Sequence, residues 1–271
     1  MELNKVLESY KTIDDFRNLS FDVITEVNSN KRKMLQPSNS FLGSTKNIKF
    51  WVFNLPRLIT CPGRTPICTR DCYQIDPEQM LKGKDQDSKV LMTRKVNLIR
   101  SLGEDFVDDV VEEINSKKSI KEKMYIRIHA SGDFYDETYL KKWIEIALSI
   151  KKNHPKYYFM AYTKSFEILD NVMSNKKDLD RIYIKVGLKP KKEYTLKDLN
   201  IHFLASEMDD TNSKDKSIMA KYKMVKYIVT ANTNAKLEEC ADIVCAKCMK
   251  CYKNPKNDIG TILRKWSYGK I

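Results

Sequence analysis

Short apolar runs alternate with longer amphipathic stretches along most of the chain. The runs carry the β-branched and aromatic residues typical of buried strands, and the stretches between them repeat their apolar positions with the period of a helix. The clearest helix is ETYLKKWIEIALSIKK, between the second and third runs. Strand, helix and strand at this spacing predict parallel β/α units. The predicted strands are residues 49–53, 125–130, 157–162, 181–186, 201–205 and 226–230.

These runs place the protein in the α/β fold class, as a partial or complete β/α barrel of about six mainly parallel strands. An open doubly wound sheet is the alternative, and in either architecture functional residues gather at the carboxyl ends of the strands. We expect three regions along the chain. They are a helical and polar N-terminal extension at residues 1–45, a β/α core at 46–236 and a cysteine-rich, metal-binding C-terminal segment at 237–271.

The chain is basic, with 49 Lys and Arg against 36 Asp and Glu and a net charge of +13. This charge favours contact with nucleic acid or another polyanion, and a lysine-rich solvated surface is the alternative explanation. The sequence has no apolar segment of the roughly 18 residues that a membrane span needs, and its start has no signal-peptide pattern. We therefore expect a cytoplasmic protein with no membrane partner, in which the cysteines stay reduced.

All seven cysteines fall into two tight groups, which favours metal ligation over a disulfide framework. The first group, Cys61, Cys68 and Cys72, lies in the loop CPGRTPICTRDCY after the first predicted strand. Three thiolates from one loop can hold three corners of a 4Fe-4S cluster and leave the fourth iron open. Zinc normally takes four ligands at short spacings, so zinc and three unligated thiols are the weaker alternatives. Gly63 would let the loop backbone come close to a cluster or a substrate.

The second group lies near the C-terminus, in CADIVCAKCMKC. Its members are Cys240, Cys245, Cys248 and Cys251, at gaps of four, two and two residues. This spacing combines features of plant-type and bacterial ferredoxin motifs, and it supplies the four ligands of a closed 4Fe-4S site. Zinc sites of four thiolates also use C-x2-C pairs. We therefore expect one or two iron–sulfur clusters, with zinc as the alternative at the C-terminal site.

Polar residues follow several of the predicted strands. In a parallel sheet these positions meet at one edge, where the site of a β/α fold forms. The residues are Ser131, Gly132 and Asp133 after the second strand, Thr163, Lys164 and Ser165 after the third, and Ser206 and Glu207 after the fifth. Those that we expect to contact a cofactor are Ser131, Gly132, Asp133, Lys164 and Glu207. The alternative at residues 131–133 is a tight turn with a helix-capping Asp.

The three histidines give little support to hydrolytic chemistry. His129 and His202 lie inside predicted strands, where a packed, hydrogen-bonded imidazole is more common than a ligand. The third, His154, precedes Pro155 in a predicted loop. The sequence also has no H-E-x-x-H motif, nucleophile elbow or phosphate-binding glycine loop, so a hydrolase is disfavoured.

Together these motifs resemble the gene product 88 family of phages and mobile elements. The resemblance rests on CPGRTPICTRDCY, RIHASGDFY, AYTKS, HFLASE and the terminal C-x2-C-x2-C, and it runs from about Lys49 to Tyr252. The layout of this family is similar to that of radical S-adenosylmethionine (SAM) enzymes. In those enzymes three cysteines follow the first strand and a glycine-acid motif follows the second.

The similarity to radical SAM enzymes implies roles for particular residues. Cys61, Cys68 and Cys72 would bind a four-iron cluster. Gly132 and Asp133 would meet the amino group of SAM, and the C-terminal cysteines would hold an auxiliary cluster. The cysteine gaps in the first group are longer than is typical of those enzymes, and Asp133 stands where they usually carry Glu.

Two functional hypotheses follow. The first is an iron–sulfur protein resembling radical SAM enzymes, which needs an electron donor and acts on an unidentified substrate that the basic charge relates to nucleic acid. The second is a DNA-binding or replication-associated protein of a mobile element, in which zinc or iron–sulfur sites only stabilise the fold. The ending RKWSYGK, with Trp266 and Tyr268, suits stacking on single-stranded nucleic acid. An open iron site that binds SAM distinguishes the two hypotheses.

Overall fold

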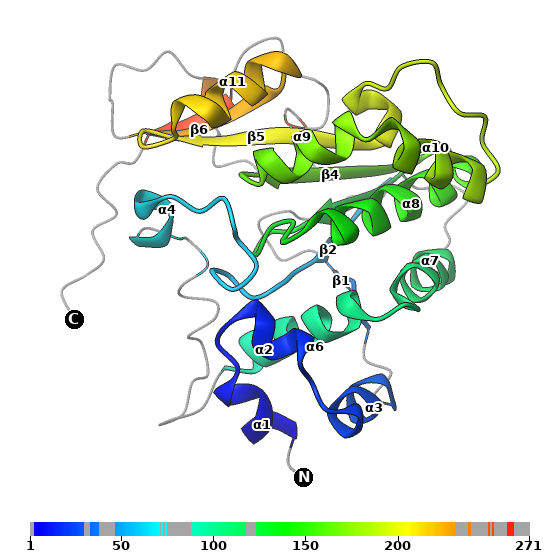
Figure 1. Cartoon of the computed structure of the whole chain (residues 1–271), viewed down its shortest axis with the longest axis vertical. Helices are drawn as coiled ribbons and strands as arrows, with labels where there is room; N and C mark the ends of the chain where they lie inside the picture. The colour runs from blue at the N-terminus through cyan, green and yellow to red at the C-terminus, as the bar shows by residue number, and fades with distance from the viewer. Residues whose placement is uncertain are drawn as a thin grey trace.

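The structure is a computed structural model, and it describes residues 3–29, 33–37, 47–70, 72, 74, 88–117, 123–230, 238–239, 249, 251 and 259–262 (Figure 1). The strands are β1 (Gln36–Pro37), β2 (Ile48–Phe53), β3 (Lys123–Ile128), β4 (Tyr157–Thr163), β5 (Ile201–Met208), β6 (Val225–Thr230), β7 (Glu238–Glu239) and β8 (Ile259–Ile262). The helices are α1 (Leu3–Ser9), α2 (Ile13–Arg17), α3 (Phe21–Ser29), α4 (Pro66–Arg70), α6 (Lys89–Leu102), α7 (Phe106–Ser116), α8 (Glu137–Asn153), α9 (Phe166–Ser174), α10 (Lys176–Lys185), the 3-10 helix η1 (Leu196–Leu199) and α11 (Ser213–Lys221). Within the described residues, no helix is both long enough and apolar enough to cross a membrane.

All of these strands belong to one sheet, in the order β1-β2-β3-β4-β5-β6-β8-β7. Strands β2 to β6 follow one another in chain order and pair in parallel, and β8 adds a sixth parallel strand beside β6. Because β/α crossovers are right-handed in nearly all proteins, strands added in one direction place their helices on one face. Helix α8 packs against α9, and α9 against α11, along one side of the sheet (Figure 1).

This topology decides between the predicted architectures. A doubly wound sheet reverses its strand order at a switch point, whereas β2 to β6 keep the chain order, so the doubly wound alternative is wrong. Among the described strands, β1 and β7 lie at opposite edges and do not pair with each other. The fold is therefore a mixed α/β structure with an open, mostly parallel sheet, and the complete barrel is not formed.

The side of the sheet that faces the helices holds the main hydrophobic core. Ile126, Phe159 and Phe203 point to this side, because side chains alternate along a strand. Trp143 of α8 is completely buried among them, and its ring meets that of Phe53 edge-on at 5.2 Å between centroids. The apolar stripe that identifies α8 in the sequence is thus the face that packs on the sheet.

The N-terminal helices share this core. Leu7, Phe16 and Val27, from α1, α2 and α3, are buried in the same cluster. All three helices contact α6, and the buried Lys95 of α6 donates a hydrogen bond from Nζ to the carbonyl oxygen of Leu7 at 2.6 Å. A buried ammonium group needs such a partner. The helices predicted in this part of the chain are confirmed, and they pack on the core through α6.

The prediction of a strand at residues 181–186 is wrong, because these residues lie in the C-terminal half of α10 and just beyond it. Leu179, Ile182 and Tyr183 are buried at helical spacing. Ile184, by contrast, is 64% exposed. The alternating isoleucines of this run imitate a strand, but the spacing of the buried positions is that of a helix. The other five predicted strands correspond to β2 to β6, and the sixth parallel strand is β8.

The opposite, helix-free face of the sheet carries a smaller apolar cluster. Phe50 of β2 and Tyr125 of β3 are buried there together with Met249. The side chain of His202 on β5 forms a hydrogen bond to the backbone of Cys251, which opposes the lowering of its pKa by burial. Met249 and Cys251 of the cysteine-rich segment therefore lie on the face that the helices leave open.

His129, just after β3, is a packed core residue, as the sequence predicts. It is 2% exposed among the rings of Phe53, Phe134 and Tyr139. Its Nε2 atom lies 2.8 Å from the hydroxyl oxygen of Tyr139. Burial, helped by the charge of Arg127, lowers the pKa of His129 to about 3.

A pair of alanine substitutions tests the helical register of α10. Ile182→Ala removes a buried side chain and should lower the free energy of unfolding by about 2 kcal/mol or more. Ile184→Ala, at an exposed position, should change it by less than about 0.5 kcal/mol. Urea unfolding followed by far-UV circular dichroism measures both values. Equal losses at the two positions would favour a strand, in which residues two apart share a face.

The environment of His129 predicts a pH dependence of stability. In the unfolded chain this histidine binds a proton near pH 6.5, whereas in the folded protein it stays neutral down to about pH 3. Protonation then favours the unfolded state, so stability should fall as the pH drops from about 6.5 towards 3, by up to about 1.4 kcal/mol per pH unit. His129→Gln removes the titrating group, and its unfolding free energy, measured at a series of pH values, should fall less steeply. Parallel curves for the two proteins would contradict a neutral, buried imidazole.

Candidate functional site

The carboxyl ends of neighbouring strands are joined at one edge of the sheet, as the sequence predicts. Asn54 directly follows β2, and its Oδ1 accepts hydrogen bonds from the N–H groups of Ala130 and Ser131 at 2.9 and 3.0 Å. The N–H of Leu55 donates to the carbonyl oxygen of Ser131 at 3.0 Å. These bonds hold the turn after β3 against the chain that leads from β2 to the first cysteine.

Asp133 connects the ends of β3 and β4. Its carboxylate accepts hydrogen bonds from the N–H of Phe134, the hydroxyl of Thr163 and the N–H of Lys164, at 2.8, 2.8 and 2.7 Å. Its own N–H donates to the carbonyl oxygen of Thr60 at 3.0 Å. Burial raises the pKa of Asp133 to about 6, although these donors oppose the shift. Asp133 thus joins β3, β4 and the loop after β2, the strand ends through its carboxylate and the loop through its N–H.

Two glycines allow the backbone segments at this edge to touch. Gly132 has a φ of 82°, and a Cβ there would lie 2.6 Å from the Cβ of Leu55 and 2.6 Å from the Oγ1 of Thr60. Only glycine readily accepts this combination of left-handed backbone and close approach. A Cβ at Gly63 would overlap the carbonyl oxygen of Lys164. The loop of the first cysteine is therefore in backbone contact with the end of β4.

Cys68, the second cysteine of the first group, is held by α4 and by the chain that follows β5. The N–H of Cys68 donates to the Oγ1 of Thr65 at 3.1 Å. The N–H of Ile67 donates to the Oδ2 of Asp210 at 2.8 Å. Asp210 lies two residues beyond β5, so the cysteine loop is attached to the ends of three successive strands.

Three thiols lie within electrostatic reach of one another at this edge. Burial raises the pKa of the Cys61 thiol most strongly, and the charges of Asp133, Cys68 and Cys72 raise it further. Burial also raises the pKa of Cys68, whereas Lys164 lowers it. The protein alone therefore disfavours the thiolate forms, and a bound metal would supply the positive charge that stabilises them.

Lys164 is the positively charged group of the site. Its Nζ donates to the carbonyl oxygen of Ser206 on β5 at 2.9 Å. Burial lowers the pKa of Lys164, and the nearby groups of Cys68, Asp133 and Asp210 oppose this. The charge thus lies between the cysteine loop and the ends of β4 and β5, where it stabilises a thiolate or an anionic ligand.

The other predicted site residues lie elsewhere. Glu207 forms an ion pair with Lys226 of β6 at 3.1 Å. Cys251 is on the helix-free face beside His202. Among the described residues, no group of three His, Cys, Asp or Glu side chains is already arranged around a metal position. The remaining members of the second cysteine group, Cys240, Cys245 and Cys248, lie outside the described residues.

Three residues that organise this edge carry no motif in the sequence: Asn54, Thr60 and Asp210. Each bonds to backbone groups of a segment that is distant along the chain, and such bonds leave no spacing pattern to recognise. Asp210 follows the same strand end that drew attention to Ser206 and Glu207. Its position two residues after β5 is the sequence signal that points to it.

The donors at this edge fit a thiolate-bound iron–sulfur cluster. They are the partly buried thiols of one loop, close enough to influence one another's pKa, with a buried ammonium group beside Cys68. Three cysteine ligands leave one iron of a 4Fe-4S cluster without a protein ligand. Asp133 is engaged in internal hydrogen bonds and positions the loop.

The close approach at Gly63 can be tested with a matched pair of substitutions. Gly63→Ala places a methyl group against the backbone of Lys164 and should lower the free energy of unfolding by about 1–3 kcal/mol. At Gly103 the nearest atom to an added Cβ is the carbonyl oxygen of Arg100 at 3.3 Å, so Gly103→Ala should stay within about 1 kcal/mol of the wild type. Urea unfolding measures both. A change at Gly63 no larger than that at Gly103 would mean that the cysteine loop does not touch β4.

Among curated proteins and among solved structures, none matches this chain. A family model described as gene product 88 matches residues 24–255. The match spans most of the chain and includes the parallel strands β2 to β6, the clamp at Asp133 and both cysteine groups. The chain therefore belongs to the gene product 88 family.

Proposed function

We propose that the carboxyl edge of the sheet binds an iron–sulfur cluster through Cys61, Cys68 and Cys72, and that the protein is an enzyme resembling radical SAM enzymes. The observation that carries the proposal is a set of partly buried thiols in one loop, attached to the ends of β3, β4 and β5 beside a buried ammonium group. The order of the parts supports it. The cysteine loop follows the first strand of the parallel series, and the turn of Gly132 and Asp133 follows the second.

The neighbouring side chains have distinct roles in this proposal. Lys164 stabilises negative charge on Cys68, and its ammonium group has three donors, of which the carbonyl of Ser206 uses one. Donors therefore remain for an anionic group of a ligand. Asp133 holds the loop through the hydrogen bond from its N–H to Thr60 and the end of β4 through its carboxylate, and Gly63 lets the backbones meet.

SAM is the ligand that we expect at the iron left open by the cysteines. A reduced cluster held by Cys61, Cys68 and Cys72 would supply the electron that cleaves the sulfonium carbon–sulfur bond of SAM to give methionine, and this cleavage is the source of hydrogen-abstracting radical chemistry. The electron comes from an external donor protein or a chemical reductant. The chain's own part is to bind and orient the reactants and to exclude water. The net charge of +13 favours a substrate related to nucleic acid.

The second cysteine group supplies the ligands of a separate centre, with zinc as the alternative to a second cluster. Cys251 bonds to His202, the second residue of β5, whereas the first cysteine loop is attached beyond the ends of the strands. We therefore expect two centres and no metal shared between the groups.

Metal analysis of protein purified without oxygen is the first test. Wild-type protein should contain the iron and acid-labile sulfide of two clusters. Cys72→Ala should lose the metal of the first site, and Cys251→Ala should lose that of the second, because each removes one thiolate ligand. Far-UV circular dichroism of both variants checks that the fold remains.

Electron paramagnetic resonance of the reduced protein then tests the open iron. Added SAM should change the spectrum of the wild type and of Cys251→Ala, and it should leave that of Cys72→Ala unchanged. Zinc at the first site, or an iron signal that ignores SAM, would contradict the proposal. A protein in which metal only stabilises the fold, with DNA binding as its function, would then be favoured.

A further inference from the structure

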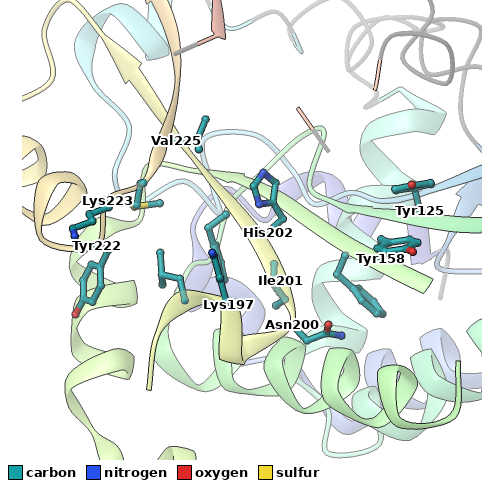
Figure 2. Close-up of a pocket in the computed structure, with 13 residues that line it drawn as sticks. Tyr125, Tyr158, Lys197, Asn200, Ile201, His202, Tyr222, Lys223 and Val225 are labelled. Atoms are coloured by element: carbon teal, nitrogen blue, oxygen red, sulfur yellow. The ribbon is translucent and has the colours of Figure 1, made fainter. Parts of the chain in front are cut away.

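A second candidate site lies at the opposite, amino-terminal edge of the sheet. A hollow of about 270 Å³ opens there between the starts of β4, β5 and β6. Figure 2 shows Tyr125 and Tyr158 on one side of it and Lys223 on the other, with Lys197 and His202 between them. None of the described residues that line the hollow is acidic. The hollow is therefore both aromatic and positively charged.

Tyr158 presents an aromatic ring at this hollow. Its ring stacks on that of Tyr125, with 4.9 Å between centroids and 17° between planes, and Tyr125 stacks in turn on Phe50. Tyr158 is 37% exposed, and the Nζ of Lys151 lies 5.0 Å from its ring centroid. Because two buried rings support it, Tyr158 has a fixed orientation. A nucleobase can stack on such a ring by taking the place of the Lys151 side chain on the face that Tyr125 does not cover.

His202 adds a hydrogen-bonding group to the hollow. Its side chain bonds to the backbone of Cys251, and its Nε2 is buried without a hydrogen-bond partner among the described residues. A neutral imidazole that donates through one nitrogen accepts through the other. The N–H groups of a nucleobase edge are donors that Nε2 can accept.

Lys223 occupies a backbone position that favours glycine. Its φ is 49°, and it directly follows the C-cap of α11, where its N–H donates to the carbonyl oxygen of Ala220 at 3.1 Å. Glycine is the usual residue at such helix ends, because a side chain is strained in the left-handed region. A lysine here accepts an unfavourable conformation and places its charge at the hollow. Strain of this kind at a pocket points to a function for the side chain.

We propose that this hollow binds a nucleotide unit, with its base stacked on Tyr158 and its phosphate paired with Lys197 and Lys223. The unit is either part of a single-stranded nucleic acid or a free nucleotide, since both present a base and a phosphate. The absence of acidic lining residues and the net charge of +13 both favour such an anion. The site is separate from Cys61, Cys68 and Cys72, which lie beyond the other end of the same strands, whereas His202 connects it to the backbone of Cys251.

Fluorescence anisotropy with a labelled oligothymidylate of about ten nucleotides tests the stacking platform. Tyr158→Val keeps a strand-forming residue but removes the ring, and it should weaken binding by about 5- to 100-fold, the loss expected for one stacked base. Tyr158→Phe keeps the ring and should bind within about twofold of the wild type. Unchanged binding in Tyr158→Val would overturn the proposal, as would failure of the wild type to bind.

Lys223→Gly tests the phosphate contact without harming the fold. Glycine suits the φ of this position, so thermal stability should be retained or increased. Binding should weaken, and the slope of log affinity against log salt should become shallower by about 0.7, as expected for one lost phosphate contact on a single strand. Lys11→Gly, at an exposed position between α1 and α2, removes the same charge far from the hollow. Equal effects of the two substitutions would show only general attraction to a basic protein and would overturn the proposal.

Competition by thymidine monophosphate identifies the source of the nucleotide. Displacement of the labelled oligonucleotide by the monophosphate supports a free nucleotide as ligand. Tight oligonucleotide binding that the monophosphate does not reverse supports a single strand. Cys72→Ala should bind the oligonucleotide as the wild type does, so the outcome at this hollow and the outcome at the cysteine edge are measured separately.

Discussion

The buried carboxylate of Asp133 is the constraint on which the carboxyl edge of the sheet depends. A carboxylate removed from water must be satisfied by fixed donors, and here these come from the turn after β3 and from the end of β4. The N–H of the same residue holds the loop after β2 through Thr60. Displacing any one of the three segments would leave a buried polar group unpaired. The position of the cysteine loop is therefore set before any metal binds.

The direction in which the strands are added determines which surfaces remain for function. The crossovers from β2 to β6 cover the same face with helices, and the structure describes no helical layer on the other face. Parallel strands normally bury both faces. Met249 and Cys251 cover part of the helix-free face, and the tyrosines at its amino edge stay partly exposed. One sheet thus offers two separate edges and a partly covered face, which is why a cysteine site and an aromatic hollow can coexist.

The pattern of apolar residues within a segment predicts a strand or helix when the buried positions follow a regular spacing in that segment. Strands β2 to β6 and helix α8 follow from contiguous or periodic apolar positions in the sequence. Residues 181–186 are wrongly predicted as a strand because their isoleucines alternate. In the structure, Ile182 and Tyr183 pack at helical spacing with Leu179. Only the contacts of neighbouring elements decide between the two, and those contacts are not visible in a single segment.

The candidate site is predictable to a similar extent. The first cysteine group and Asp133 are identified by type, spacing and position after a strand. The same rule selects Glu207, which alternation along β5 puts on the side of Ala205, where it pairs with Lys226. The sequence pattern does not identify Asn54 and Asp210, because they bond to backbone groups of distant segments.

The two edges of the sheet favour ligands of opposite charge. The carboxyl edge gathers thiols and carboxylates around one buried ammonium group, so it favours a cation such as a metal centre. The hollow at the amino edge has two lysines and no acidic side chain among its described lining residues, so it favours an anion. Tyr158 and Lys164 are six residues apart on and just beyond β4, a span of roughly 20 Å in an extended strand. A nucleotide stacked on Tyr158 would therefore lie too far from the thiols of Cys61, Cys68 and Cys72 to react there itself, and only a longer molecule anchored at the hollow would span both edges. A strand anchored in this way can reach the cysteine edge only by running along the helix-free face, past Tyr162 with Arg127 over its ring at 4.7 Å.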